Sequence, residues 1–465
     1  MASTSSSPSP SSSYSSASPP SYYSPTISQM NQDHLISILL LLPLDSIISF
    51  SITCRKFRSL ASSNILWEEI CRRDWGSGVV DAMISSASLQ DRGEFYWKRI
   101  YQRISQMGLL FCRRLSTTDG ILPRPRASHS LNFVSDCLVL FGGGCEGGRH
   151  LDDTWVAHVG DGFDRVLRWK QVNSGTPSGR FGHTCTMLGK ALVLFGGIND
   201  NGIRHNDTWV GEVIQEESLV TTISWSLLDV EPLLPPARGA HAACYIGDRQ
   251  IVIHGGIGLY GLRLSDTWLL ELSNNLRFAR WQQFAHIRPS PPPRSGHSIT
   301  CIGDKRIVLF GGRGSGYEVL NDLWILDLKD PFPKWSELKY DLSNSPGAMP
   351  LPRVGHSAMT ILGGKVLIYG GEDSQRHRKD DFWVLDVGAL SRFQATGLEK
   401  NLQKMWKKLG IEGQCPNCRS FHGACMDRAG LRLFVFGGMV DSMVHPAEAY
   451  GLNFDGELYL IELVF

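Results

Sequence analysis

The stretch RFGHTCTMLGKALVLFGGINDNGIRHNDTW, residues 180–209, decides the fold, because its pattern comes round six times in the chain. It begins with Arg-x-x-His, continues through an apolar run into Gly-Gly, and ends with an acid two residues before an aromatic. The doublets are separated by 54, 59, 56, 59 and 67 residues, starting from the one at 142–143. A period near 50 is typical of propeller blades. The repetition therefore predicts six blades.

Each repeat divides into four short apolar runs bounded by Gly and Pro, which predicts a four-stranded antiparallel blade. The second run leads into the doublet, the third contains the aromatic, and the fourth has a Trp followed three residues later by an apolar residue, as in Trp169 and Val172. Glycine tolerates positive φ and close approach of a neighbouring strand, so an alanine in the doublet should clash.

The sixth repeat lacks a fourth run, since Phe465 follows soon after the third. An unpaired strand edge has to be covered, and the run 109–115 stands at the same spacing before the first repeat as the other fourth runs do before theirs. We therefore predict that this strand closes the ring by pairing with the C-terminal strand. Cys112 and Leu115 would take the places of the Trp and its apolar partner.

Composition narrows the class of protein. The chain has 465 residues, 42% hydrophobic and 20% charged, with a formal net charge of +1, which gives no reason to expect nucleic acid or an anionic membrane as a partner. The longest apolar stretch, 35–42, is far shorter than the roughly 20 residues of a membrane helix. Eleven cysteines at irregular spacing favour a reducing compartment, so we expect a cytoplasmic or nuclear protein.

The part before the repeats differs in character. Residues 1–28 are rich in Ser and Pro and are expected to be a disordered tail. Residues 29–75 show the leucine spacing of short helices, and 76–108 read as a helical linker with a helix over 94–101. The predicted fold is thus a small all-α domain followed by an all-β six-bladed propeller over 109–465.

Two known families resemble these parts. The repeats resemble kelch repeats, in which an apolar run into Gly-Gly is followed by an aromatic and then a Trp. The helical part resembles an F-box, with Leu42-Pro43, Cys54-Arg55-Lys56-Phe57 and Trp67 at the family spacing. The two together resemble plant F-box/kelch-repeat proteins, which are substrate receptors of SCF ubiquitin ligases. The resemblance implies that the F-box binds a Skp-family adaptor, and through it a cullin, while the propeller holds an unidentified target protein for ubiquitination and degradation.

The F-box candidates for a shared core and adaptor interface are apolar residues of this domain, whose burial would drive docking. They are Leu35, Ile38, Leu42, Pro43, Ile47, Cys54 and Trp67.

The repeated Arg, His and Asp residues are expected to fasten neighbouring strands and loops by charge-assisted hydrogen bonds, since a catalytic residue would be singular. Residues that occur once are better candidates for recognition. In an up-and-down blade the loops after the second and fourth strands share one rim, and Arg and Tyr are favoured anchors there. The rim candidates for target binding are Arg149, Arg204, Tyr260, Arg263, Arg313, Tyr317, Arg376 and Arg378. Acids in the same loops make the charge of this rim mixed.

The sequence contains parts of two metal sites that could support catalysis, but neither site is complete. Cys415-x-x-Cys418 has the spacing of a zinc site, but no second pair lies nearby. Asp441-x-x-x-His445 resembles part of the iron site of nitrile-forming kelch proteins, but Gly437 stands where that site needs Glu. We therefore expect no cofactor and a non-catalytic adaptor. A kelch scaffold outside the ubiquitin system is the alternative, and a metal-dependent propeller enzyme is a third reading.

Overall fold

The structure is a computed structural model that describes residues 27–86, 96–117, 120–159, 168–215, 221–284, 289–303, 305–329, 332–339, 347, 349–388, 405–441 and 453–464. The chain forms two compact units, 1–70 and 71–465. The first boundary thus lies at 70 rather than at the predicted 75. The predicted tail 1–28 lies outside the described residues, except for the start of the short helix η1 (Ile27–Gln29). No described helix is long and apolar enough to cross a membrane.

The first unit is helical, as predicted. Its helices are α1 (Gln32–Leu40), α2 (Leu44–Ser51), α3 (Arg55–Leu60) and the first part of α4 (Asn64–Trp75). Asn31 caps α1, since its side chain accepts a hydrogen bond from the Asp33 N–H at 3.0 Å. Pro43 precedes α2 at the N-cap position, where its fixed φ suits the entry to a helix. A small core forms from Leu35, Leu39, Ile47, Phe57, Leu60, Leu66, Trp67 and Ile70, all buried.

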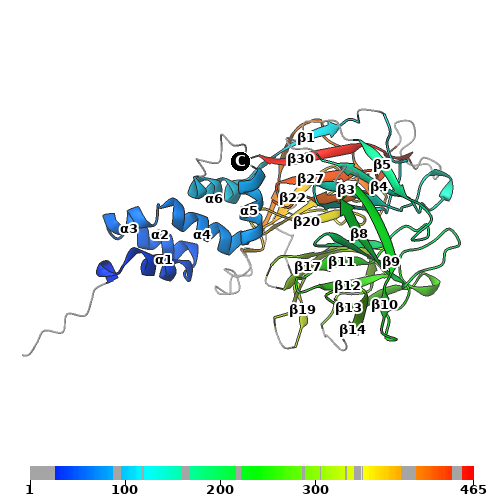
Figure 1. Ribbon diagram of the computed structural model, residues 1–465, viewed down its shortest axis with the longest axis horizontal. Coiled ribbons are helices and arrows are strands. Elements are labelled where there is room, and N and C mark those ends of the chain that lie inside the picture. The colour runs from blue at the N-terminus through cyan, green and yellow to red at the C-terminus, as the bar shows by residue number, and fades with distance from the viewer. Residues whose placement is uncertain are drawn as a thin grey trace, which may run out of the picture. The chain divides into compact units, whose positions relative to one another are not determined.

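The second unit is built mainly of strands arranged as the predicted propeller (Figure 1). Six sheets are blades and a seventh is a small three-stranded sheet of β25 (Arg419–Ser420), β28 (Met439–Val440) and β29 (Asn453–Phe454). Blades 1 and 2 are β2 (Ser130–Val134), β3 (Cys137–Phe141), β4 (Thr154–His158), β5 (Trp169–Asn173), and β6 (Thr184–Leu188), β7 (Ala191–Phe195), β8 (Thr208–Gln215), β9 (Thr221–Leu227).

Blades 3 to 5 follow the same antiparallel order. Blade 3 is β11 (Ala242–Tyr245), β12 (Gln250–Ile257), β13 (Arg263–Leu272) and β14 (Phe278–Gln283), with β10 (Asp229–Val230) parallel to β14. Blade 4 is β16 (Ser298–Cys301), β17 (Arg306–Gly314), β18 (Val319–Asp327) and β19 (Lys334–Leu338), with β15 (Arg294–Ser295) beside β17. Blade 5 is β20 (Ser357–Ile361), β21 (Lys365–Tyr369), β22 (Phe382–Leu385) and β23 (Trp406–Lys408).

Blade 6 closes the ring as predicted. Its own strands β26 (Gly423–Met426), β27 (Arg432–Phe436) and β30 (Leu458–Val464) are completed by β1 (Leu109–Leu115), which runs antiparallel to β30. Cys112 pairs with Ile461, two residues after Tyr459, just as Trp281 pairs with Leu270, two residues after Trp268. Cys112 therefore occupies the register position of a fourth-strand Trp. The strand β24 (Gly410–Gly413) covers the outer edge of β1 in parallel.

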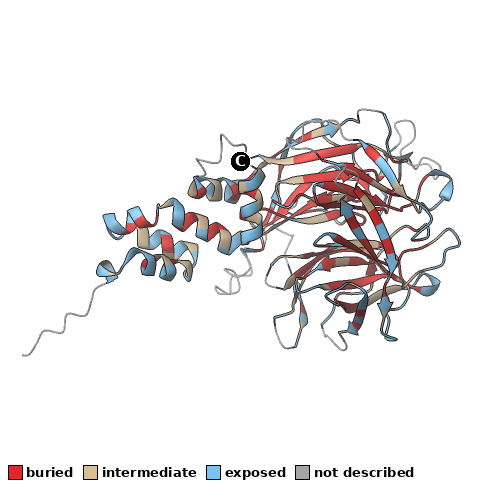
Figure 2. Cartoon of the chain, in the orientation of Figure 1, coloured by how far each residue is buried: buried red, intermediate tan, exposed pale blue. Residues whose placement is uncertain are grey.

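The core of the propeller lies between the blades. Six hydrophobic clusters each join two neighbouring blades, and the second strands are buried along their length (Figure 2). In five clusters the last aromatic ring of a second strand packs on the fourth-strand Trp of the next blade, as Phe195 does on Trp281 with ring centroids 4.8 Å apart. At Cys112 the Trp is missing, and Tyr369 instead stacks on Phe382 at 4.2 Å. Stacking thus compensates for the small thiol.

The described parts of the predicted linker are mainly helical and belong to the same unit as the strands: α5 (Ser77–Ser86) and α6 (Trp97–Gln106) precede the first strand. The helix predicted over 94–101 is described from Trp97 and extends to Gln106. The end of α6 is fixed to blade 5. Lys365, at the start of the second strand, donates to the Ser105 carbonyl at 3.3 Å, and Lys407 donates to the Met107 carbonyl at 2.7 Å. Since second strands begin on the face opposite the Gly-Gly doublets, the chain enters the propeller on the face away from the rim.

Candidate functional site

The repeated arginine forms a clamp within each blade, as the sequence predicts. Arg238 donates two hydrogen bonds to the Asp266 carboxylate at 2.8 and 2.7 Å, and one to the Gly255 carbonyl at 3.0 Å. The Trp268 indole donates to the same carboxylate at 2.7 Å. Burial by itself raises the pKa of Asp266, but the hydrogen bonds and charge of Arg238 outweigh it and lower the pKa. The equivalent pairs are Arg126–Asp153, Arg180–Asp207, Arg294–Asp322, Arg353–Asp381 and Arg419–Asp455.

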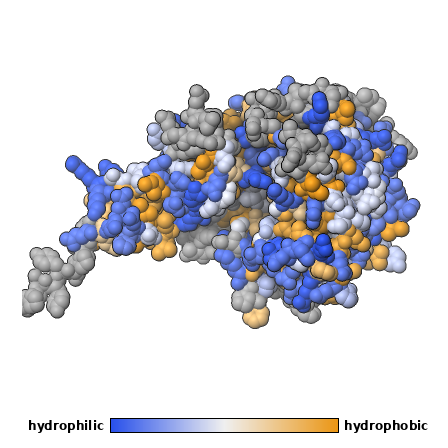
Figure 3. Space-filling view, in the orientation of Figure 1, coloured by the Kyte–Doolittle hydropathy of each residue, from blue (hydrophilic) through white to orange (hydrophobic). Residues whose placement is uncertain are grey.

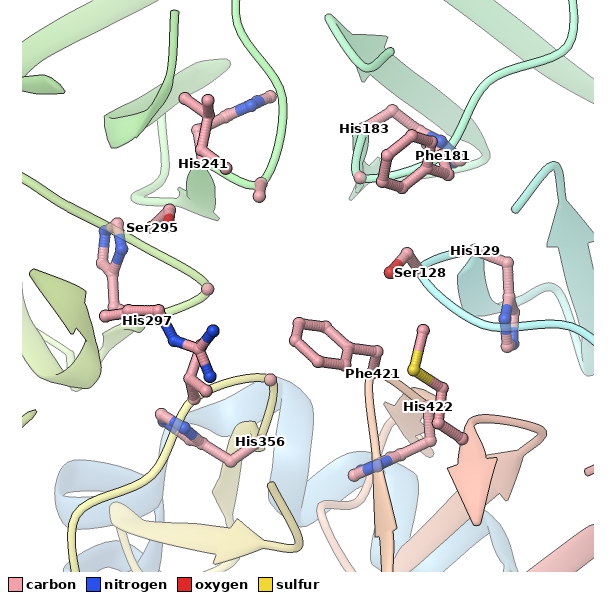
Figure 4. A pocket seen from close by; sticks show the side chains of 18 of the residues that line it. Ser128, His129, Phe181, His183, His241, Ser295, His297, His356, Phe421 and His422 are labelled. Carbon is pink, nitrogen blue, oxygen red and sulfur yellow. The ribbon is translucent and has the colours of Figure 1, made fainter. Parts of the chain in front are cut away.

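Four of the six repeated histidines, His183, His241, His356 and His422, fasten one blade to the one before it, whereas the ring nitrogens of His129 and His297 have no hydrogen-bond partner in the described part of the chain. The His183 ring nitrogen Nε2 lies 3.2 Å from the Ser130 hydroxyl of the preceding blade, and His356 makes the same contact with Ser298 at 2.9 Å. Burial, and then the charge of the clamp arginine, lowers the pKa of both histidines to about 3. These imidazoles are therefore neutral. Figure 4 shows the labelled histidine rings directed into the wall and away from the central opening.

The doublets allow neighbouring blades to meet. Gly196 and Gly197 have φ of +66° and +104°, and the Gly197 N–H donates to the Arg238 carbonyl of the next blade at 2.9 Å. A Cβ atom at Gly196 would lie 2.7 Å from that same carbonyl oxygen. The clash expected for alanine follows from this contact.

A ring of backbone hydrogen bonds, which the sequence did not lead us to expect, surrounds the central opening. The second residue after each clamp arginine has positive φ, and its N–H donates to the carbonyl of the equivalent residue in the preceding blade at 2.7–2.9 Å. The ring closes from Phe421 back to Ser128. Its members are Ser128, Gly182, Ala240, Gly296, Gly355 and Phe421. The sequence signal for this ring is a small residue two positions after the clamp arginine in five of the six repeats.

A cavity of about 350 Å³ occupies the channel mouth above this ring. That is the lower range of ligand pockets, which are mostly apolar with a few placed polar groups. Its apolar lining includes Phe181, Ile257, Val354, Phe421 and Met439, and its charged lining consists of Arg263 and Arg313. Figure 4 shows the Phe421 ring projecting toward the opening. Two of the predicted rim residues, Arg263 and Arg313, line this cavity.

The structure brings part of the predicted rim to this cavity. Arg204, Arg263 and Arg378 occupy equivalent positions, because each is bridged to the residue after its doublet. Tyr260 and Tyr317 are exposed by 95% and 70%. Arg149 and Arg376 are exposed, and Arg204, Arg263 and Arg313 are half-buried.

Arg378 differs from the expectation of a free rim residue, because its side chain is buried. It donates to Asp441 and, at 3.3 Å, to the Ser420 hydroxyl. The pairing also gives Asp441 a structural role, while His445 lies outside the described residues.

The acids of this part of the rim turn inward. Glu372 is buried, accepts a hydrogen bond from Ser420 at 2.8 Å, and lies 3.5 Å from Arg313 and 3.9 Å from Arg378. Asp373 binds Lys379 of its own loop at 2.8 Å. The rim therefore carries both acidic and basic side chains, as predicted, but Glu372 and Asp373 are already paired with basic side chains.

The F-box candidates separate into two groups. Leu35, Ile47 and Trp67 are buried and build the core of the helical unit. Ile38, Pro43 and Cys54 are exposed, and Leu42 is half-buried. Sequence reasoning missed three exposed apolar residues of α1 and α2 and their ends, Leu41, Ile48 and Ile52. Figure 3 shows hydrophobic side chains at the surface of this unit.

The suspected zinc motif consists of Cys415 and Cys418. Cys415 packs against the cluster that contains Cys112, and among the described residues no group of three His, Cys, Asp or Glu side chains could hold a metal ion.

Comparison with protein families identifies both parts of the chain. The family described as KLHDC2/KLHL20/DRC7 Kelch-repeats domain matches residues 111–219, 182–349 and 334–457. The F-box domain family matches residues 27–69. These matches confirm the predicted order of a helical F-box followed by kelch repeats.

Several curated plant proteins are similar to most of this chain. F-box/kelch-repeat protein At1g51550 of Arabidopsis thaliana is 54% identical over 462 residues, covering 96% of this chain and 95% of that protein. Adagio protein 3 of the same plant is 30% identical over 421 residues, covering 89% of this chain and 61% of that protein. Adagio-like protein 1 of Oryza sativa subsp. japonica is 28% identical over 412 residues, covering 86% and 60%. The chain thus spans about three fifths of the length of these two Adagio proteins.

Proposed function

We propose, from the fact that this chain belongs to the F-box/kelch-repeat protein family, that it is the substrate-recognition subunit of an SCF-type ubiquitin ligase. The F-box binds a Skp-family adaptor and through it a cullin. The propeller holds a target protein for ubiquitination and degradation. The protein itself is a non-catalytic adaptor, and its contribution is to raise the effective concentration of the target's lysines near the charged ubiquitin carrier.

The exposed apolar surface of the F-box is the observation that supports this proposal most. Leu41 is 86% exposed, and Ile38, Ile48 and Ile52 are also exposed on a domain with a complete core of its own. Burying apolar surface is favourable by about 25 cal/mol per Å², so leaving these side chains in water indicates a docking surface. This exposed apolar surface of the F-box supports its proposed role in adaptor binding.

The propeller supports the other half of the proposal. Its clamps, doublets and backbone ring make a rigid disc, and loops on a rigid scaffold are where binding usually resides. The 350 Å³ cavity lies on the rim face, whereas α6 joins the propeller on the opposite face. A bound target would therefore not compete with the entry of the chain. The proposal also places the protein in the cytoplasm or nucleus, in keeping with eleven cysteines that form no disulfide.

Co-purification with a Skp-type adaptor tests this function. We expect the adaptor to be recovered with the wild-type chain and lost from the double variant Leu42→Ala and Pro43→Ala. The control is Leu227→Ala, an exposed leucine of the propeller strand β9, which should retain the adaptor. Equal recovery with all three chains, each with an unchanged unfolding midpoint, would contradict the proposal and favour a kelch scaffold outside the ubiquitin system.

A further inference from the structure

The cavity at the channel mouth has an uncompensated positive charge. Arg313 has Glu372 at 3.5 Å, and Arg378 has Glu372 and Asp441. Arg263 has no acidic partner among the residues that the structure describes. Its Nε donates weakly to the Ser295 hydroxyl at 3.3 Å, and its guanidinium lies 4.6 Å from the centroid of the Tyr317 ring. Arg263 is therefore held in position by neutral groups, with its charge left for another partner.

The loop that holds Arg263 in place is strained. In the five blades where it is described, the fifth residue after the second glycine of the doublet lies in the left-handed region. It is Gly148, Gly202 and Gly261 in blades 1 to 3 and Arg376 in blade 5. In blade 4 it is Tyr317, with φ of +68°. A tyrosine pays a conformational penalty there that glycine does not, and such outliers persist where they serve a site. Glycine in three sister blades shows that the turn itself does not need the ring.

Both the cavity and its rim carry apolar side chains. Phe421 and Val354 line the cavity, Tyr317 packs on the Arg263 that also lines it, and Tyr260 and Tyr317 are exposed rings of the rim loops. Glu318, the acid next to Tyr317, folds back over its own loop, since its carboxylate occupies the space beside Gly314 and Gly316. The patch therefore combines aromatic faces with one free guanidinium.

We propose that this patch binds an acidic segment of the target protein, in which a carboxylate side chain pairs with Arg263 and an adjacent aromatic or aliphatic side chain packs on Phe421 and Tyr317. The proposal rests on the target-binding role of the propeller and specifies its chemistry. Charge complementarity selects the carboxylate, because Glu372 and Asp441 are already paired with Arg313 and Arg378, and the Glu318 carboxylate lies over its own loop. The apolar lining selects its neighbour.

Synthetic peptides test this directly with the purified full chain. The probes are fluorescent pools of hexapeptides with acetylated and amidated ends, built around a fixed Glu-Phe, Gln-Phe or Lys-Phe pair. With the ends blocked, only the fixed side chain differs between the pools. We expect the Glu-Phe pool to bind about tenfold or more tightly than the other two, and its affinity to fall with added salt.

Three variants separate recognition from folding. Arg263→Gln should abolish the preference for Glu, whereas Arg149→Gln, an exposed rim arginine of blade 1, should leave it unchanged. Tyr317→Gly should weaken binding of the Glu-Phe pool while the unfolding midpoint stays the same or rises, because glycine relieves the strained φ. Equal affinities for the three pools, absence of binding by all of them, or an intact preference in Arg263→Gln would overturn the proposal. Adaptor recovery is measured in parallel. Its loss from the wild type would count against the ligase role and leave the peptide result standing.

Discussion

Mild acid should unfold the propeller because of its buried histidines. Seven imidazoles lie in its core, and burial is the largest cause that lowers the pKa of each. Nearby clamp arginines and neighbouring histidines lower these pKa values further. The residues are His129, His183, His241, His254, His297, His356 and His422. In the folded protein they remain neutral at pH 5.5, whereas in the unfolded chain they take up protons.

The sign and the size of the effect follow from this difference. A histidine of the unfolded chain titrates near pH 6.5, so stability is complete above that value and is lost as the pH falls toward the folded pKa, about 3 for His183, His254 and His356. At pH 5.5 each residue removes ~1.4 kcal/mol from the free energy of unfolding. Seven such residues remove ~10 kcal/mol, comparable with the whole stability of a typical protein, about 5–15 kcal/mol.

Urea unfolding followed by tryptophan fluorescence at pH 7.5, 6.5 and 5.5 measures this loss. His183→Gln should recover ~1.4 kcal/mol of the difference between pH 7.5 and 5.5, since it removes one titrating group. The exposed His377 is the control, and His377→Gln should leave the difference unchanged. The clamp aspartates Asp153, Asp207, Asp266 and Asp381, whose pKa values are lowered, destabilise the fold only as the pH falls below about 4. If the free energy of unfolding stayed constant between pH 7.5 and 5.5 and fell only below pH 4, the buried histidines would not be the cause of acid unfolding.

Three further predictions concern the fold. Gly196→Ala should lower the free energy of unfolding by ~1–3 kcal/mol more than Gly189→Ala does, because both have positive φ but only Gly196 has a backbone oxygen 2.7 Å from the new Cβ; equal urea midpoints would contradict this. Arg238→Met should cost ~3–5 kcal/mol by leaving the half-buried Asp266 carboxylate without its cation, and a loss under 1 kcal/mol would show that the clamp is dispensable. In the closing strand β1, Leu110→Asp should unfold blade 6 while its neighbour Phe111→Asp is tolerated, since their exposures are 0% and 41%; similar melting temperatures would mean that β1 does not close the ring.

The repeating parts of the fold could be predicted because each repeat supplies the same signal. Arg-x-x-His, Gly-Gly and the acid before the aromatic recur at one period. All six arginine–aspartate pairs and four of the six histidines make the fastening contacts that we predicted, but His129 and His297 do not. Closure by 109–115 followed from spacing alone, and the register of Cys112 confirms it. The backbone ring through Ser128 and Phe421 was not predicted, because backbone hydrogen bonds leave no side-chain signature beyond small residues.

The functional surfaces were harder to predict, since they depend on which side of an element faces outward. In α1, Leu35 and Leu39 point into the core while Ile38 and Leu41 do not, although all four are apolar. On the rim, the sequence could not show that Arg378 is paired and Arg263 is not, because their partners come from other blades. Pairing across sixty residues of sequence, as between Arg378 and Asp441, becomes visible only in the folded ring.

We propose that the F-box surface attaches the propeller to the ligase, and a calorimetric titration of the purified full chain with a purified Skp-type adaptor measures this attachment. We expect one adaptor per chain, with the affinity lowered at least tenfold by Leu41→Asp, an exposed residue whose change spares the core. Leu227→Asp in the propeller should bind as tightly as the wild type. Absence of binding by the wild-type chain, or equal affinities for all three proteins, would contradict the claim.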